Sequence, residues 1–158
     1  MSILHLHLVL NHVPVVGALF ALLLFASAIV LRETVSTKFA LGFTAAIAAV
    51  SVVVYFTGGA AEEAVEKLAG VTERSIERHE EAAELTTIAM SILGGLSLVA
   101  LFVFRARKAP RWVAMAGLVG TVIVSTLMGW TANLGGQIRH TEIQGTSNQQ
   151  QADHDSED

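Results

Sequence analysis

The chain opens with residues 1–31, MSILHLHLVLNHVPVVGALFALLLFASAIVL, in which no Asp, Glu, Lys or Arg occurs. Three further stretches without these charges cover residues 39–61, 85–104 and 112–138. Each stretch provides the roughly 20 residues that an α-helix needs to cross the ~30 Å hydrocarbon core of a bilayer. Backbone polar groups in lipid must be satisfied within the segment, so the four stretches are predicted to be helices. The sequence therefore predicts an all-α, polytopic membrane four-helix bundle.

The composition of the whole chain agrees with a membrane protein. Of its 158 residues, 53% are hydrophobic and 15% are charged, against about 25% charged in an ordinary soluble domain. A water-soluble bundle would need polar helix faces that these segments lack. The net charge of −4 argues against a nucleic-acid-binding protein. The chain has no Cys, which excludes disulfides, thiolate metal sites, iron–sulfur clusters and covalently attached haem.

The charged residues divide unequally between the two ends of the predicted bundle. The connections after spans one and three carry a single acid, Glu33, and six basic residues: Arg32, Lys38, Arg105, Arg107, Lys108 and Arg111. Lys and Arg concentrate on the cytoplasmic side of membrane proteins. We therefore predict a multi-pass protein of the bacterial inner (cytoplasmic) membrane with both termini in the periplasm. Residues 1–31 lack the basic start of a signal peptide and are interpreted as a retained span.

The segment between spans two and three is charged but patterned. Five residues recur there at spacings of three and four: Ile76, His79, Ala83, Thr86 and Met90. This spacing predicts that span three extends outward as an amphipathic helix with His79 on its inward face. Residues 141–158 are polar and acidic and are predicted to form a disordered tail. The chain thus divides into a transmembrane four-helix bundle, residues 1–140, and a tail, residues 141–158.

Small residues four apart are expected to let the helices approach closely. There are four such pairs within the spans: Gly42–Ala46, Ala45–Ala49, Ala116–Gly120 and Ser125–Gly129. They predict sites of helix packing and nothing more specific.

The predicted topology brings every histidine to the outer side. His5, His7 and His12 lie at the start of span one, His79 near the start of span three, His140 just past span four and His154 in the tail. A rise of about 1.5 Å per residue places His12 at the outer edge of the hydrocarbon and the other three helix-linked histidines just above it, so four histidines share one layer: His7, His12, His79 and His140. Pro14 biases Val13 away from helix. Span one therefore begins either before Pro14 or near it, and in the second case residues 3–12 form a short element over the bundle mouth.

Imidazoles gathered in one layer indicate a metal centre, because neutral imidazole is the commonest metal ligand. Two His from facing helices can hold a b-type haem in a bundle. The predicted axial ligands of one or two haem b groups form two pairs, His12 with His79 and His7 with His140. Arg78 and Arg139 each neighbour a candidate ligand and are predicted to bind haem propionates. Trp130 fits either an interfacial aromatic belt or the face of the macrocycle.

Two motifs resemble a known family. Residues 7–14, HLVLNHVP, resemble the H-P-x-x-V-H-F-P opening of the bacterial four-helix membrane proteins grouped as domain-of-unknown-function family 2231. Residues 129–140, GWTANLGGQIRH, resemble its closing T-G-W-x-G-G…H segment, and Thr57-Gly58 resembles its T-G turn. Leu8 and Val13 depart from the opening motif, and the closing motif carries extra residues before its Gly pair. The resemblance spans residues 7–140 and implies the four-helix architecture and the histidine set.

These observations predict a membrane-embedded b-type cytochrome. It would transfer electrons at the periplasmic face between a periplasmic redox protein, such as a cytochrome c, and a quinone or another membrane subunit. We see no nucleophile constellation or phosphate loop, so any enzymatic role would come through these redox partners. Two alternatives stay open: a non-redox accessory subunit of a larger membrane complex, and a His-based copper- or zinc-handling membrane protein.

Overall fold

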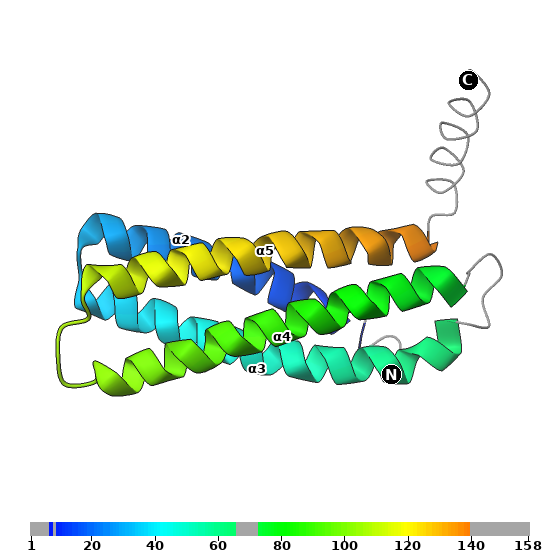
Figure 1. The fold of residues 1–158 in the computed structure, drawn as a ribbon, viewed down its shortest axis with the longest axis horizontal. Helices are drawn as coiled ribbons and strands as arrows, with labels where there is room; N and C mark the ends of the chain where they lie inside the picture. Colours follow the sequence, from blue (N-terminus) through cyan, green and yellow to red (C-terminus); the bar gives the residue numbers. More distant parts are fainter. Residues whose placement is uncertain (1–6, 8, 66–72, 140–158) are drawn as a thin grey trace, which may run out of the picture.

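The structure is a computed structural model that describes residues 7, 9–65 and 73–139 of the chain. Four helices follow one another: α2 (His12–Leu31), α3 (Thr34–Val65), α4 (Glu73–Val103) and α5 (Arg111–Arg139). Each contains a stretch long and apolar enough to cross a membrane. The predicted all-α four-helix bundle with four candidate spans is therefore confirmed (Figure 1).

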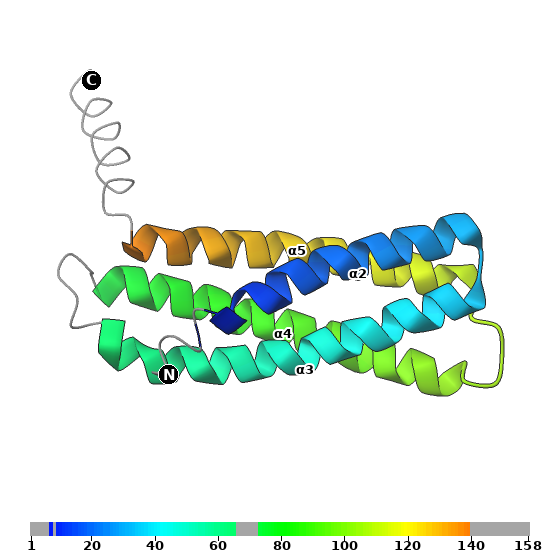
Figure 2. The same cartoon turned by 180° about the vertical axis from the view of Figure 1, so that it is seen from behind.

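The helices run up and down in an antiparallel bundle. α3 packs against α2 and α4, and α5 packs against α4 and closes the bundle against α2. The connections α2–α3 and α4–α5 lie at one end, while α3 ends and α4 starts at the other (Figures 1 and 2). We call the first end the cationic end, after the six basic residues near its two connections, and the second the histidine end, after His7, His12 and His79. The predicted separation of the basic connections from these three histidines is confirmed.

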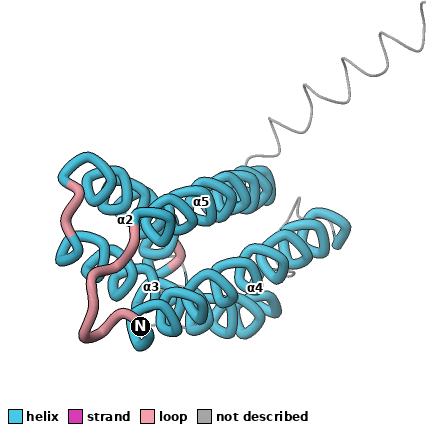
Figure 3. Tube along the Cα trace, turned by 60° about the vertical axis from the view of Figure 1, so that its left-hand side comes forward, coloured by secondary structure: helices cyan, strands magenta, loops and turns pink. Residues whose placement is uncertain are grey.

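The connections at the cationic end are short and tied together (Figure 3). Arg32 ends α2 in the left-handed conformation, with φ 57°, and its N–H donates to the Ala28 carbonyl at 3.0 Å. The side chain of Lys38 on α3 donates to the Arg105 carbonyl in the second connection at 3.0 Å. Pro110 directly precedes α5, where its missing N–H costs no helical hydrogen bond. The left-handed Arg32, the Lys38 hydrogen bond and Pro110 together allow each connection to reverse the chain direction within a few residues.

The interior of the bundle is built largely from small and apolar side chains. One buried cluster lies midway along the helices and comprises Ala18, Ile47, Ala48, Met90, Val124 and Met128. A second lies toward the cationic end and comprises Phe25, Ala28, Ala40, Leu41, Val113 and Ala114. Buried hydroxyls such as that of Thr44 donate to a carbonyl one turn back in their own helix, at 2.8 Å for Thr44 to Ala40. Large apolar side chains such as Val30, which is 78% exposed, face outward, as expected for helices in contact with lipid.

Glycines make the closest contacts between helices. A Cβ added to Gly94 on α4 would collide with Ala48 on α3, and one added to Gly117 on α5 would collide with the ring of Phe25 on α2. The predicted small-residue pairs were only partly correct. Gly120 does pack, against Leu93, but four members of those pairs are exposed on the bundle surface: Ala46, Ala49, Ala116 and Gly129. Hydropathy alone did not show which side of each helix faces inward.

Candidate functional site

His79 lies on the inward face of α4, as the sequence predicted. It is half-buried, and its Nδ1 lies 3.1 Å from the backbone carbonyl oxygen of Thr131 on α5. The charged residues around it are all exposed: Glu77, Arg78, Glu80, Glu81 and Glu84. The outer part of α4 is therefore amphipathic, with a single titratable side chain directed into the bundle among its described residues.

Thr131 joins α4 to α5 beside this histidine. Its Oγ1 lies 3.1 Å from the Ala82 carbonyl on α4 and 3.0 Å from the Leu127 carbonyl on its own helix, so its one proton is directed to these acceptors. The hydroxyl of Thr86 lies 2.9 Å from the same Oγ1 and must then be the donor. Thr131 thus fixes His79 through its carbonyl and the two helices through its hydroxyl.

Gly135, one turn beyond Thr131, gives the His79 ring its place. A Cβ added to Gly135 would lie 2.9 Å from His79 Cε1 and 3.3 Å from His79 Nδ1. Carbon atoms in good contact are about 3.5–4.0 Å apart. Only a residue without a side chain therefore lets the imidazole rest this close to α5.

His7 is held in the same way against α3. It is half-buried, and its carbonyl accepts the N–H of Asn11 at 2.9 Å in a helical turn that precedes α2. Its Nδ1 lies 3.2 Å from Thr57 Oγ1, and its Cε1 lies 3.1 Å from where a Cβ of Gly58 would stand. Asn11 follows this turn as the N-cap of α2, which begins at His12 with Pro14 in its first turn, where Pro is tolerated. Each of the two imidazoles thus meets one Thr and one Gly of a neighbouring helix.

The hydrogen bonds define the tautomer of both rings. Thr57 donates its hydroxyl proton to the Val54 carbonyl at 2.8 Å, so its oxygen accepts from His7. The Thr131 carbonyl can only accept, so it receives a proton from His79. In both neutral imidazoles Nδ1 therefore carries the proton and Nε2 carries the lone pair.

The surroundings of His7 favour its neutral form. Burial lowers the pKa of His7 below its usual value, contact with the Val54 backbone opposes this in part, and the nearby charge of His79 lowers it further. Burial disfavours the charged form because the protonated ring loses its hydration. The effect of His79 means that the two histidines lie close enough to influence each other, although they belong to different elements.

The other predicted site residues are less clearly placed. His12 is exposed at the first residue of α2, Arg78 is exposed beside His79, and Trp130 is 48% exposed on α5. His140 and the side chain of Arg139 lie outside the described residues, as do His5, His154 and the predicted tail. The pairings of His12 with His79 and of His7 with His140 consequently stay predictions. Within residues 7, 9–65 and 73–139, no three His, Cys, Asp or Glu side chains come together as a metal site.

Sequence reasoning missed the part played by Thr131. Thr57, Gly58 and Gly135 entered it only as letters of a family motif, without a partner. A usable signal was present, since a Thr and a Gly four residues apart, as in Thr131 and Gly135, lie on one face of a helix. No known protein family, curated protein or solved structure matches this chain. The family resemblance of its motifs stays a prediction.

Proposed function

We propose that this protein is a membrane-embedded b-type cytochrome that transfers electrons at the periplasmic face. One observation carries the proposal. His7 and His79 lie at the histidine end on separate elements, and each has Nδ1 bound to a protein oxygen and Nε2 left with its lone pair. Metal-ligating histidines almost always donate their other ring N–H in this manner, because the bond fixes ring orientation and raises ligand basicity. His7 and His79 are the proposed axial ligands.

The residues around the two rings suit a large, flat, apolar group. Gly58 and Gly135 let the rings lie directly against α3 and α5. The Asn11 Oδ1 is buried and has no hydrogen-bond partner among the described residues. An unpaired buried oxygen is costly, and a polar edge of a bound group or a water beside it would satisfy Asn11.

The number of donors favours haem over zinc or copper. Protein zinc sites use three or four side-chain ligands, and no such group exists within the described residues. A haem needs one or two axial ligands and supplies its own four equatorial nitrogens. The two oriented imidazoles of His7 and His79 would provide the two axial ligands of such a haem. This pairing differs from the predicted pairs of His12 with His79 and of His7 with His140. It leaves His12 and His140 as candidates for a second pair, with Arg139 and Trp130 as proposed contacts of that second group, which would make two haems per chain.

The distribution of charged residues supports the proposed orientation in the membrane and the proposed periplasmic redox partner. The basic connections at the cationic end suit the cytoplasmic side, which supports a periplasmic position for the histidine end. Exposed acids on α4, including Glu77, Glu80 and Glu84, would attract a basic periplasmic redox protein such as a cytochrome c. Arg78 is the basic side chain nearest in sequence to His79 and is proposed to pair with a propionate. The membrane-side partner is a quinone or another subunit.

In this proposal haem supplies a reversible one-electron couple. Thr57 and Thr131 would hold the tautomers of the two imidazoles, Gly58 and Gly135 would let the rings lie close to α3 and α5, and the apolar side chains of the bundle would limit access of water. Axial ligands, burial and hydrogen bonds to the ligands set the potential of such a group.

Reduced-minus-oxidised spectra of the purified protein, with haem extraction and metal analysis, test the proposal. We expect a b-type α-band and low-spin, bis-imidazole signals in paramagnetic resonance. His7→Leu and His79→Leu should each abolish the low-spin signal. His154→Leu, which changes a histidine that the sequence gives no role, is the matched control and should leave it intact.

Three results would overturn the proposal. A folded protein without an α-band would favour an accessory role. Stoichiometric copper or zinc would favour metal handling. An unchanged spectrum in both His7→Leu and His79→Leu would remove these two residues from the ligand set.

A further inference from the structure

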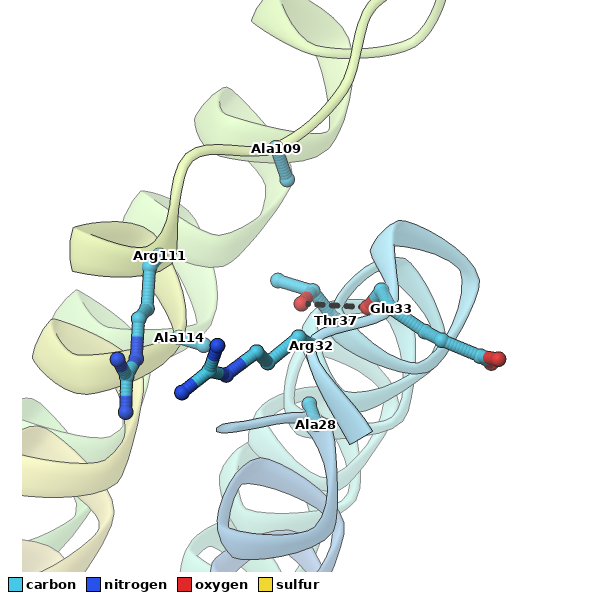
Figure 4. A pocket seen from close by; sticks show the side chains of 7 residues that line it. All are labelled: Ala28, Arg32, Glu33, Thr37, Ala109, Arg111 and Ala114. Atoms are coloured by element: carbon cyan, nitrogen blue, oxygen red, sulfur yellow. Dashed lines mark hydrogen bonds between the residues drawn. The ribbon is translucent and has the colours of Figure 1, made fainter. Parts of the chain in front are cut away.

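A cavity of about 260 Å³ opens at the cationic end, far from the histidines (Figure 4). Its walls come from the end of α2, the start of α3 and the start of α5. Ala28 and Ala114 form its inner wall, and Arg32 and Arg111 contribute the two basic side chains. The cavity therefore joins an apolar inner side to a strongly basic mouth.

The two guanidinium groups share this space without a counter-ion. Figure 4 shows the Arg32 side chain extended toward α5 and Arg111, while the carboxylate of Glu33 points away from both. Within the described residues, neither guanidinium has a hydrogen bond or an ion pair. Like charges on one cavity repel each other, so an anion placed between them would be stabilised by both.

The backbone at this end adds to the positive potential. α5 begins at Arg111, and the first N–H groups of a helix lack partners within the helix and carry its positive dipole end. Arg32 stands in a left-handed conformation, φ 57°, that glycine adopts most easily. The turn therefore holds Arg32 in a strained backbone conformation, and Figure 4 shows its side chain extended toward α5.

Neighbouring side chains put this cavity at the boundary between hydrocarbon and water. Trp112, beside Arg111, is 63% exposed, and Leu31, beside Arg32, is 58% exposed. Tryptophan is enriched at the head-group level of membranes. An anion held by Arg32 and Arg111 would then have exposed apolar side chains of α2 and α5 below it, along which acyl chains can lie.

We propose that this cavity binds the phosphate of an anionic phospholipid head group. Guanidinium groups bind phosphate oxygens in a bidentate manner, and basic pockets between transmembrane helices recognise such head groups. The open apolar surface beneath the arginines favours a lipid over a free phosphate ion. The assignment is independent of the haem proposal, because no residue is shared.

The test uses the purified full chain in mild detergent. Native mass spectrometry compares retention of phosphatidylglycerol and phosphatidylcholine added in equal amounts, with inorganic phosphate as a competitor. The double variant Arg32→Gln with Arg111→Gln removes both cavity charges. The matched control, Arg107→Gln with Lys108→Gln, removes two exposed charges from the same end that do not line the cavity. Arg111→Gln alone serves if the double variant does not fold.

We expect wild type to retain phosphatidylglycerol preferentially and the cavity variants to lose about fivefold of that preference for each charge removed. The control should keep nearly all of it. Equal retention of the two lipids by wild type, or an equal loss in the control, would overturn the proposal. Displacement of the lipid by equimolar inorganic phosphate would also overturn it, since the cavity would then bind a free anion.

Discussion

Gly135→Ala tests whether α5 positions His79 by close approach. The new Cβ would lie 2.9 Å from His79 Cε1 and 3.3 Å from Nδ1, whereas good carbon contacts are about 3.5–4.0 Å. The imidazole would have to shift by about half an ångström or more. Its bond to the Thr131 carbonyl, already 3.1 Å long, would weaken or break.

The expected cost follows from three contributions. Overpacking a tight contact costs about 1–3 kcal/mol, and losing one hydrogen bond costs about 0.5–1.5 kcal/mol. Ala gains about 1 kcal/mol over Gly in helix propensity. The net loss in the free energy of unfolding should be about 2 kcal/mol. Gly136→Ala, whose Cβ would meet nothing within 4 Å, should instead gain up to about 1 kcal/mol.

Reversible unfolding in mixed detergent, monitored by circular dichroism, measures both variants. Nitrogen chemical shifts of the His79 ring report the tautomer independently of stability. We expect Gly135→Ala to be less stable than Gly136→Ala and to change the His79 signals, and Gly136→Ala to leave them unchanged. Equal stabilities with unaltered His79 signals in both variants would refute the role given to Gly135.

Three further predictions concern other parts of the bundle. Gly94→Ala should cost about 2 kcal/mol because the added carbon collides with α3, whereas Gly95→Ala, with nothing nearby, should be neutral or stabilising; equal unfolding curves would contradict the α3–α4 contact. In the purified chain without added ligand, the lowered pKa of His7 means that docking of its turn is strongest above about pH 6.5 and weakens in acid; the protection of the Asn11 N–H from hydrogen exchange, relative to its intrinsic rate at each pH, should therefore fall as pH falls, and His7→Gln should remove this dependence. Arg32→Gly should raise the free energy of unfolding by up to about 1 kcal/mol by relieving the left-handed strain; a lower thermal midpoint would argue against strain there.

The sequence was sufficient for the fold because long uninterrupted stretches of apolar residues mark the four spans. The sequence was also sufficient to predict that His79 points inward, because the charged residues on both sides of it mark the outward face of this part of α4. In the membrane-spanning parts of the helices, no charged residues indicate which face points inward. Gly94 and Gly95 are adjacent and equally apolar in context, yet only Gly94 meets another helix. The pairing of His79 with Thr131 joins residues 52 positions apart. The spacing of Thr131 and Gly135 marks one face of their helix, but it does not identify His79 as the residue that packs there.

The hydroxyl of Thr131 also has a mechanical consequence. It engages carbonyls of both α4 and α5 and accepts from Thr86, so axial sliding of one helix past the other would break several bonds together. A bilayer whose thickness differs from the span length is usually accommodated by helix tilt or local adjustment of the lipid. With α4 and α5 locked in register, such a mismatch should tilt the pair as a unit. The distance between His79 and α5 should then be the same in thin and thick membranes.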